Sequence, residues 1–92
     1  MNNLSDEKTI PLRTPIEHAG TTHTELQMRE PTAGELVEID KHSGRAADVF
    51  AVSLISGVPR GAVEKLPARE FLAAARYVAA FLGEDLPTGE NG

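Results

Sequence analysis

The amino-acid sequence predicts an α+β fold, in which an N-terminal β-hairpin is followed by three or four helices in a single small domain. Apolar and polar side chains alternate between residues 8 and 29, and this two-residue period is typical of strands. From residue 32 onward, apolar residues recur at helical spacing between prolines and glycines. The length of 92 residues allows one domain with a modest core. We therefore expect one folded unit over residues 8–83.

The first strand is predicted over residues 8–16, where Ile10 and Leu12 alternate with polar or proline neighbours. Pro11 favours an edge position for this strand, because proline cannot donate a hydrogen bond to a neighbouring strand.

A turn is predicted over residues 17–21, with Gly20 available for a positive φ angle. The second strand follows over residues 22–29. One face of it is expected to carry Thr24, Leu26 and Met28, and the other His23, Glu25, Gln27 and Arg29. Because an isolated hairpin is marginally stable in water, it must pack against the helices.

The first helix is predicted to begin at a sharp corner after the second strand. Pro31 pushes the residue before it into extended geometry. Thr32 and Glu35 then form the T-x-x-E pattern of a capping box, which marks a helix N-terminus. Leu36 and Ile39 supply the apolar face of a short helix.

Three further helical segments are expected. The first, over residues 45–56, contains the uncharged stretch Val49–Ile55, which predicts burial on several sides. A short helix follows over residues 59–66. The last helix runs from Pro67 to Leu82 and is terminated by Gly83. Residues 1–7 are expected to be disordered, and residues 84–92 to form a disordered acidic tail.

The last helix carries more apolar side chains than one inward stripe requires. The expected inward stripe consists of Phe71, Ala75, Val78 and Leu82. A second face, which we expect to be exposed and to bind a partner, consists of Ala74, Tyr77 and Phe81, with Glu70 as its only charge. The alternative, in which this second face packs on the hairpin, remains open.

The sequence offers no pattern for catalysis, a cofactor or a metal. It contains no cysteine, which excludes disulfides and thiolate zinc sites. His18 and His23 have the spacing of a zinc-finger histidine pair but lack the cysteines that accompany it. Neither a glycine-rich phosphate loop nor a nucleophile elbow is present. We therefore expect a non-enzymatic protein in which His18, His23 and His42 are solvated on the surface.

Binding to nucleic acid is the alternative function from another class. Residues 46–66 have the pattern of a helix-turn-helix, with an apolar helix, a glycine-containing turn and a second short helix. Only Arg60, Lys65 and Arg69 would face DNA phosphates. The net charge is −5, and no strong basic patch is visible. A helical hairpin within the core is the simpler interpretation, and a subunit of a host complex is a third possibility. We also expect no signal peptide and no membrane span, because residues 1–12 lack a basic region followed by an apolar run and the uncharged run 49–59 is too short to span a bilayer.

The segment TIPLRTPIEHAGTTHTELQMREPTAGELVEIDK, from Thr9 to Lys41, resembles the opening of Mu-like bacteriophage tail assembly chaperones. The later pattern, an apolar helix running into LISGVP and a final helix ending in Phe81 and Leu82, is similar too, so the resemblance extends from Thr9 to Leu82. Its most specific block is Arg29, Glu30, Pro31, Thr32, Ala33, Gly34, Glu35 and Leu36. The chain has Glu70 where the family often has aspartate, and its acidic tail has no counterpart.

The resemblance implies a non-enzymatic chaperone that binds the tape measure protein and keeps it soluble while tail tube subunits polymerise around it. It also implies action in the host bacterial cytoplasm and absence from the mature virion. Further partners implied are a longer, frameshifted form of the chain and the tail tube protein, with no cofactor, nucleic acid or membrane. The small core is compatible with a homo-oligomer.

Overall fold

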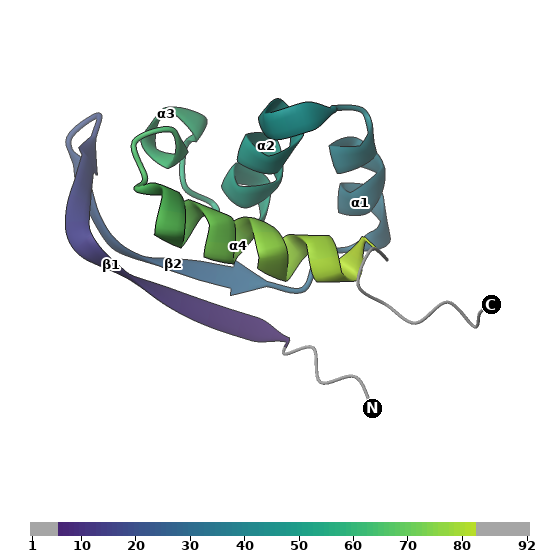
Figure 1. Cartoon of the computed structure of the whole chain (residues 1–92), viewed down its shortest axis with the longest axis horizontal. Coiled ribbons are helices and arrows are strands. Elements are labelled where there is room, and N and C mark those ends of the chain that lie inside the picture. The colour runs from purple at the N-terminus through teal and green to yellow at the C-terminus, as the bar shows by residue number, and fades with distance from the viewer. Residues whose placement is uncertain (1–5, 83–92) are drawn as a thin grey trace.

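The computed structural model describes residues 6–82. Within them, a two-stranded antiparallel hairpin is followed by four helices (Figure 1). The elements are β1 (Glu7–His18), β2 (Thr21–Arg29), α1 (Ala33–Asp40), α2 (Gly44–Ser56), α3 (Arg60–Val63) and α4 (Ala68–Phe81). The predicted α+β fold is therefore confirmed, and every predicted element is present, although the strands extend into the predicted turn and α3 is shorter than the predicted helix over residues 59–66.

The disorder predicted for both ends of the chain lies mostly outside the described residues. At the N-terminal end, only Asp6 and Glu7 of residues 1–7 are described. The N–H of Glu30 donates to the carbonyl of Asp6 at 2.8 Å, and Glu7 begins β1. The strand thus begins one residue earlier than predicted. The acidic tail, residues 84–92, is not described.

The helices pack on one face of a long, curved hairpin (Figure 1). Helix α4 lies along the hairpin and contacts both strands, while α2 contacts β2 and α4, and α3 contacts β1. The most deeply buried large side chains come from the hairpin, α2, α3 and α4, and they are Leu26, Met28, Val52, Val63 and Val78. The hairpin therefore reaches stability as predicted, by packing its apolar face on helices.

The hairpin turn is tighter than the predicted turn over residues 17–21, because β1 extends to His18 and β2 begins at Thr21. Gly20 has φ 82°, which confirms that the turn uses its freedom. Ala19 also has a positive φ, 51°, although side chains other than glycine and asparagine rarely adopt it. Two consecutive residues with positive φ are the pattern of a type I′ turn, which matches the twist of the strands on either side.

A register shift in the hairpin overturns part of the predicted face assignment. Strand pairing runs to Pro11↔Glu25 and resumes at Ile16↔His23, so residues 12–15 of β1 lie opposite a single residue, Thr24. Thr24 is therefore exposed and His23 half-buried, the reverse of the prediction, whereas Leu26 and Met28 face the core as predicted. A strict two-residue alternation cannot continue through such an irregularity.

Helices α2 and α3 end and begin where glycine and proline predict. Gly57 has φ 77° and donates its N–H to the carbonyl of Ser53 at 2.9 Å, which closes α2. Pro59 precedes α3, which spans only four residues. Of the uncharged stretch in α2, Ala51, Val52 and Ile55 are buried, while the other apolar side chains are half-buried.

Candidate functional site

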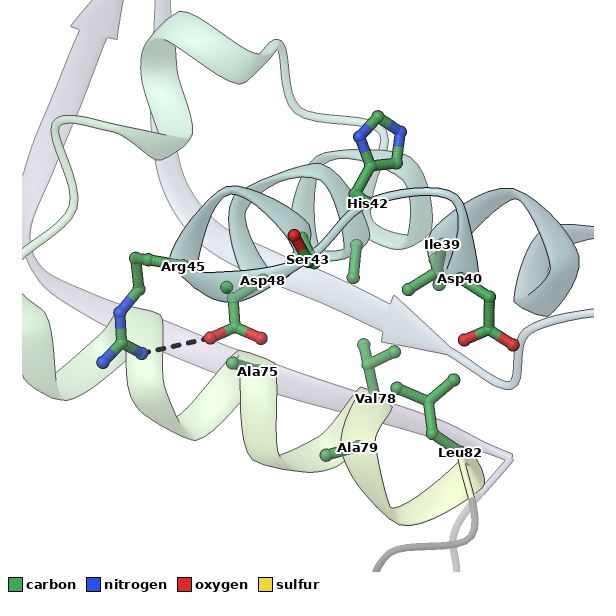
Figure 2. Close-up of a pocket in the computed structure, with 13 residues that line it drawn as sticks. Ile39, Asp40, His42, Ser43, Arg45, Asp48, Ala75, Val78, Ala79 and Leu82 are labelled. Carbon is green, nitrogen blue, oxygen red and sulfur yellow. Dashed lines mark hydrogen bonds and ion pairs between the residues drawn. The ribbon is translucent and has the colours of Figure 1, made fainter.

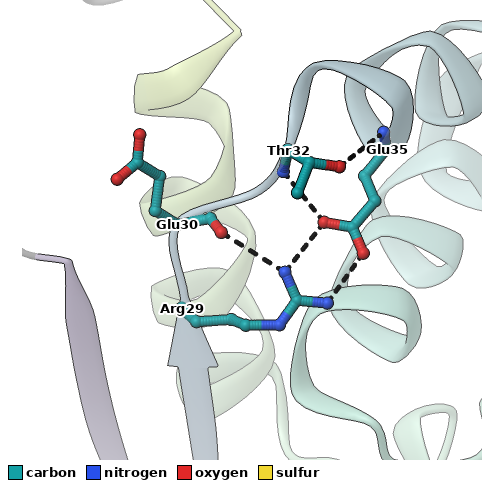
Figure 3. A network of polar contacts seen from close by, with 4 residues as sticks. All are labelled: Arg29, Glu30, Thr32 and Glu35. Carbon is teal, nitrogen blue, oxygen red and sulfur yellow. Dashed lines mark hydrogen bonds and ion pairs between the residues drawn. The ribbon is translucent and has the colours of Figure 1, made fainter.

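The block REPTAGEL forms the corner between β2 and α1, and its polar side chains bind one another (Figure 3). The guanidinium of Arg29 donates to both carboxylate oxygens of Glu35 at 2.8 and 2.7 Å. Thr32 Oγ1 accepts from the backbone N–H of Glu35 at 3.2 Å, and the backbone N–H of Thr32 donates to Glu35 Oε1 at 2.9 Å. The predicted capping box is thus confirmed, and Arg29 adds a bidentate ion pair with Glu35 that the sequence pattern did not indicate.

The contacts within this cluster shift the pKa values of Arg29 and Glu35. Hydrogen bonds from Arg29 and then from the backbone of Thr32 lower the pKa of Glu35 to about 2. The hydrogen bond to Glu35 raises the pKa of Arg29. Both side chains therefore stay charged in the folded protein at neutral pH. The role of this cluster is structural, because both carboxylate oxygens of Glu35 already accept hydrogen bonds from residues of the corner.

Both apolar faces of α4 contact the rest of the fold: Val78 of the predicted inward stripe is buried, and the second face is covered as well. Ala74 is fully buried and Tyr77 is 8% exposed, while Phe81 is half-buried with its ring 5.2 Å from that of Tyr77. The expectation that this second face is exposed is wrong, because it packs on the hairpin. Binding of a partner by these three residues stays a prediction; Ala74 is covered by the fold, whereas Tyr77 lines a pocket with Lys8, Ala73 and Arg76.

Glu70 shows how closely this face of α4 fits β1. The carboxylate of Glu70 is buried, and its Oε2 accepts from Arg13 Nε at 3.0 Å. Burial by itself would raise the pKa of Glu70, but hydrogen bonds from its own backbone N–H and from Arg13 lower it overall. The ion pair between Glu70 and Arg13 therefore holds α4 against β1.

Burial raises the pKa of Tyr77, and the charges of acidic residues at the end of the hairpin raise it further.

The residues predicted to face inward pack against the core as predicted, and they also line a groove on the other side of α4 from the hairpin. The first pocket of this groove, about 530 Å³, lies between the α1–α2 loop, α2 and the C-terminal half of α4 (Figure 2). Its apolar floor includes Ile39, Ala51 and Val78, which are buried. Its exposed or half-exposed rim consists of Asp40, Ser43, Arg45, Asp48, Ala75, Ala79 and Leu82. Only Val78 of the predicted stripe is fully covered by the rest of the fold.

A second pocket of about 400 Å³ lies closer to the N-terminus of α4 and shares one lining residue, Arg45, with the first. It is more apolar and is lined by Val49, Val63, Leu66, Phe71 and Leu72, together with Arg45, Glu64 and Ala68. Arg45 lines both pockets and is paired with Asp48 at 3.1 Å, so this ion pair sits where the two pockets meet. We refer to the two pockets together as the α2–α4 groove.

The prediction that all three histidines are solvated is correct only for His42, which is exposed beside the ring of Phe50. His18 is half-buried against α3, where a Cβ added at Gly61 would lie 2.5 Å from His18 Cε1. His23 is turned inward by the register shift described above. Within residues 6–82, no group of three or more histidine, aspartate and glutamate side chains is arranged to hold a metal ion.

The geometry does not favour the helix-turn-helix interpretation of residues 46–66. Helix α3 has only four residues, too few for a helix that reads a DNA groove. Its cations are also engaged within the chain: Arg60 pairs with Glu64 at 3.4 Å, and Lys65 Nζ donates to the carbonyl of Glu17 at 2.7 Å. Among the described helices, none has the length and apolar character needed to cross a membrane.

Comparisons with known proteins place the chain in one family. No curated protein and no solved structure matches it significantly. Residues 9–83, in contrast, match the family described as "Phage tail assembly chaperone proteins, E, or 41 or 14". The match spans the hairpin and all four described helices, including the REPTAGEL corner. On this ground the chain belongs to the phage tail assembly chaperone family.

Proposed function

We propose that this protein binds the tape measure protein through the α2–α4 groove and keeps it soluble while the tail tube assembles. The observation that carries the proposal is the groove itself, a concavity with an apolar floor and a largely polar rim in a member of the tail assembly chaperone family. In so small a domain, apolar surface that the fold does not cover is typical of a binding site.

The groove has the form of sites that bind an amphipathic helix. Such sites offer an apolar floor between two helices, with polar side chains at the rim that orient the ligand. Helices α2 and α4 supply the walls, and Phe71, Leu72 and Leu82 supply half-buried apolar contacts. A helical protein that exposes apolar stripes before assembly would aggregate, and covering those stripes prevents this.

The proposal needs no chemical step, so the protein acts as a binding chaperone and not as an enzyme. Its place of action is the host bacterial cytoplasm, and it leaves the complex before the virion is complete. A longer, frameshifted form of the chain and the tail tube protein are proposed as further partners, which would link the bound tape measure to tube subunits.

A co-expression experiment tests this function with two matched variants of α4. Ala79 lines the groove, whereas Ala73 lies on another side of the helix near Lys8 and Arg76. We expect wild type and Ala73→Glu to keep co-expressed tape measure protein soluble and to co-purify with it. Ala79→Glu places a longer, charged side chain in the groove and should leave the partner insoluble, because it blocks the close approach of a helix that the methyl group of Ala79 permits.

The measurements are the soluble fraction of the tape measure protein and the amount that co-purifies. Circular dichroism establishes that both variants are folded. The proposal is wrong if the wild-type chain neither co-purifies with the tape measure protein nor raises its solubility. It is also wrong, as regards the groove, if folded Ala79→Glu protects the partner as well as wild type does.

A further inference from the structure

We infer that the α2–α4 groove accepts a single amphipathic helix with apolar anchors seven residues apart and basic side chains on its flanks. This inference rests on the proposed function in treating the groove as a binding site. It adds the spacing and the charge of the helix that occupies it.

The spacing follows from the positions of the two pockets along α4. The first pocket is lined by residues 75–82 of α4 and the second by residues 68–72. At 1.5 Å per residue, the centres of these segments lie about 13 Å apart along the helix. A helix lying along α4 returns to the same face after seven residues, a rise of about 10 Å. Anchors at positions i and i+7 therefore reach one pocket each.

The two pockets differ in how closely they let a partner approach. In the first, Ala75 and Ala79 lie one turn apart and present only methyl groups, so the backbone of a docked helix can come close. In the second, Phe71 and Leu72 with Val49 surround an apolar hollow that suits a large side chain. A partner helix would therefore insert its bulkier anchor near the N-terminus of α4.

The charge preference follows from the side chains that line the groove. Three carboxylates line it, those of Asp40, Asp48 and Glu64, against the single guanidinium of Arg45. Arg45 and Asp48 already pair at 3.1 Å, and Glu64 pairs with Arg60 at 3.4 Å. Asp40 is exposed and has no ion-pair partner among residues 6–82. The excess of negative charge favours a helix with lysine or arginine beside its apolar stripe.

Three synthetic helical peptides of equal length test both features by fluorescence anisotropy at low ionic strength. The first carries leucines at i and i+7 with flanking lysines. The second has the same composition, but its second leucine is moved to i+5, on the opposite side of the helix. The third keeps the leucines and replaces the lysines with glutamates. We expect the first to bind at least about tenfold more tightly than either of the others.

Charge-reversal variants of the protein assign the effect to the groove. Asp40→Lys/Asp48→Lys should reverse the order of the lysine and glutamate peptides. The control, Glu17→Lys/Glu25→Lys, makes the same change of net charge on exposed positions of the hairpin, outside both pockets, and should keep the wild-type order. Equal binding of all three peptides, absence of any binding, or an unchanged order in the folded groove variant each overturns the inference.

The outcome separates this inference from the proposed function. If the peptides do not bind but co-expressed tape measure protein stays soluble, the inference fails and the chaperone function stands. If the lysine peptide binds as expected but the tape measure protein is not protected, the groove accepts such a helix and the proposed partner is wrong.

Discussion

At the scale of single residues, the glycines of this chain differ in what they contribute. Gly57 has φ 77° and terminates α2, so any side chain there would be strained. Gly34 lies in the first turn of α1, at a φ that is not positive, and a Cβ there would have no atom within 4 Å. Gly57 is therefore required by the backbone, whereas the fold imposes no such requirement at Gly34.

We expect Gly34→Ala to raise the free energy of unfolding by about 0.4–1 kcal/mol, because alanine reduces the entropy of the unfolded chain without a clash. The matched control, Gly57→Ala, should lower it, since alanine is strained at positive φ. Urea denaturation of both variants measures the difference. A Gly34→Ala protein less stable than wild type would show that this exposed corner has constraints beyond its backbone geometry.

At the scale of elements, the link between β2 and α1 is a compact polar lock. Arg29, at the end of β2, donates to the carboxylate of Glu35 in the first turn of α1, and Thr32 caps that helix (Figure 3). The same carboxylate thus accepts from the strand and from the helix N-terminus. This arrangement explains why Arg29 and Glu35 occur together: their ion pair joins the end of β2 to the first turn of α1.

The lock should make stability depend on pH through Glu35. Its pKa in the folded protein, about 2, lies below the usual value of 4.5, so ionisation of Glu35 stabilises the fold. This contribution is fully present above about pH 4.5 and is lost as the pH falls toward 2. Glu35→Gln keeps the shape but not the charge, so it should be less stable at pH 7 and show a weaker loss on acidification.

Urea denaturation of wild type and Glu35→Gln at a series of pH values checks this. The two stabilities should converge as the pH approaches 2. A constant difference between them across the whole range would mean that the charge of Glu35 does not contribute to stability.

At the scale of the whole molecule, α4 contacts both the hairpin and α2, and α2 in turn contacts β2. One face of α4 is closed by the hairpin, and the other remains as the wall of the α2–α4 groove (Figures 1 and 2). The face of α4 that the hairpin covers contributes to the stability of the fold, and the face that lines the groove is the one that we propose binds a partner.

Two substitutions on α4 distinguish these uses. Ala74 is fully buried against the hairpin, whereas Ala79 is half-buried in the groove. We expect Ala74→Glu to unfold the protein at 25 °C, because an unpaired buried charge costs several kcal/mol in a domain of marginal stability. Ala79→Glu should melt close to wild type. Thermal melts by circular dichroism measure both, and a folded Ala74→Glu protein would contradict the packing described here.

The groove residues were the part of the candidate site that sequence reasoning missed. The spacing of Ala75, Ala79 and Leu82 indicates a helical stripe, and Arg45 and Asp48 make the start of α2 amphipathic. These signals show that each helix has an apolar and a polar side. They do not say that the two helices meet along an open groove, because that depends on a packing arrangement between segments about 30 residues apart.

The sequence by itself determined the order and the approximate limits of the elements, the capping box at Thr32, the end of α2 at Gly57 and the family resemblance. These features depend on neighbours along the chain, so local rules are enough to predict them. Only the tertiary structure decided the register shift that turns His23 inward, the pairing of Glu70 with Arg13 and which face of α4 is covered. An apolar stripe predicts that one face of a helix is buried, but which element covers that face depends on where the hairpin and α2 lie in the folded protein.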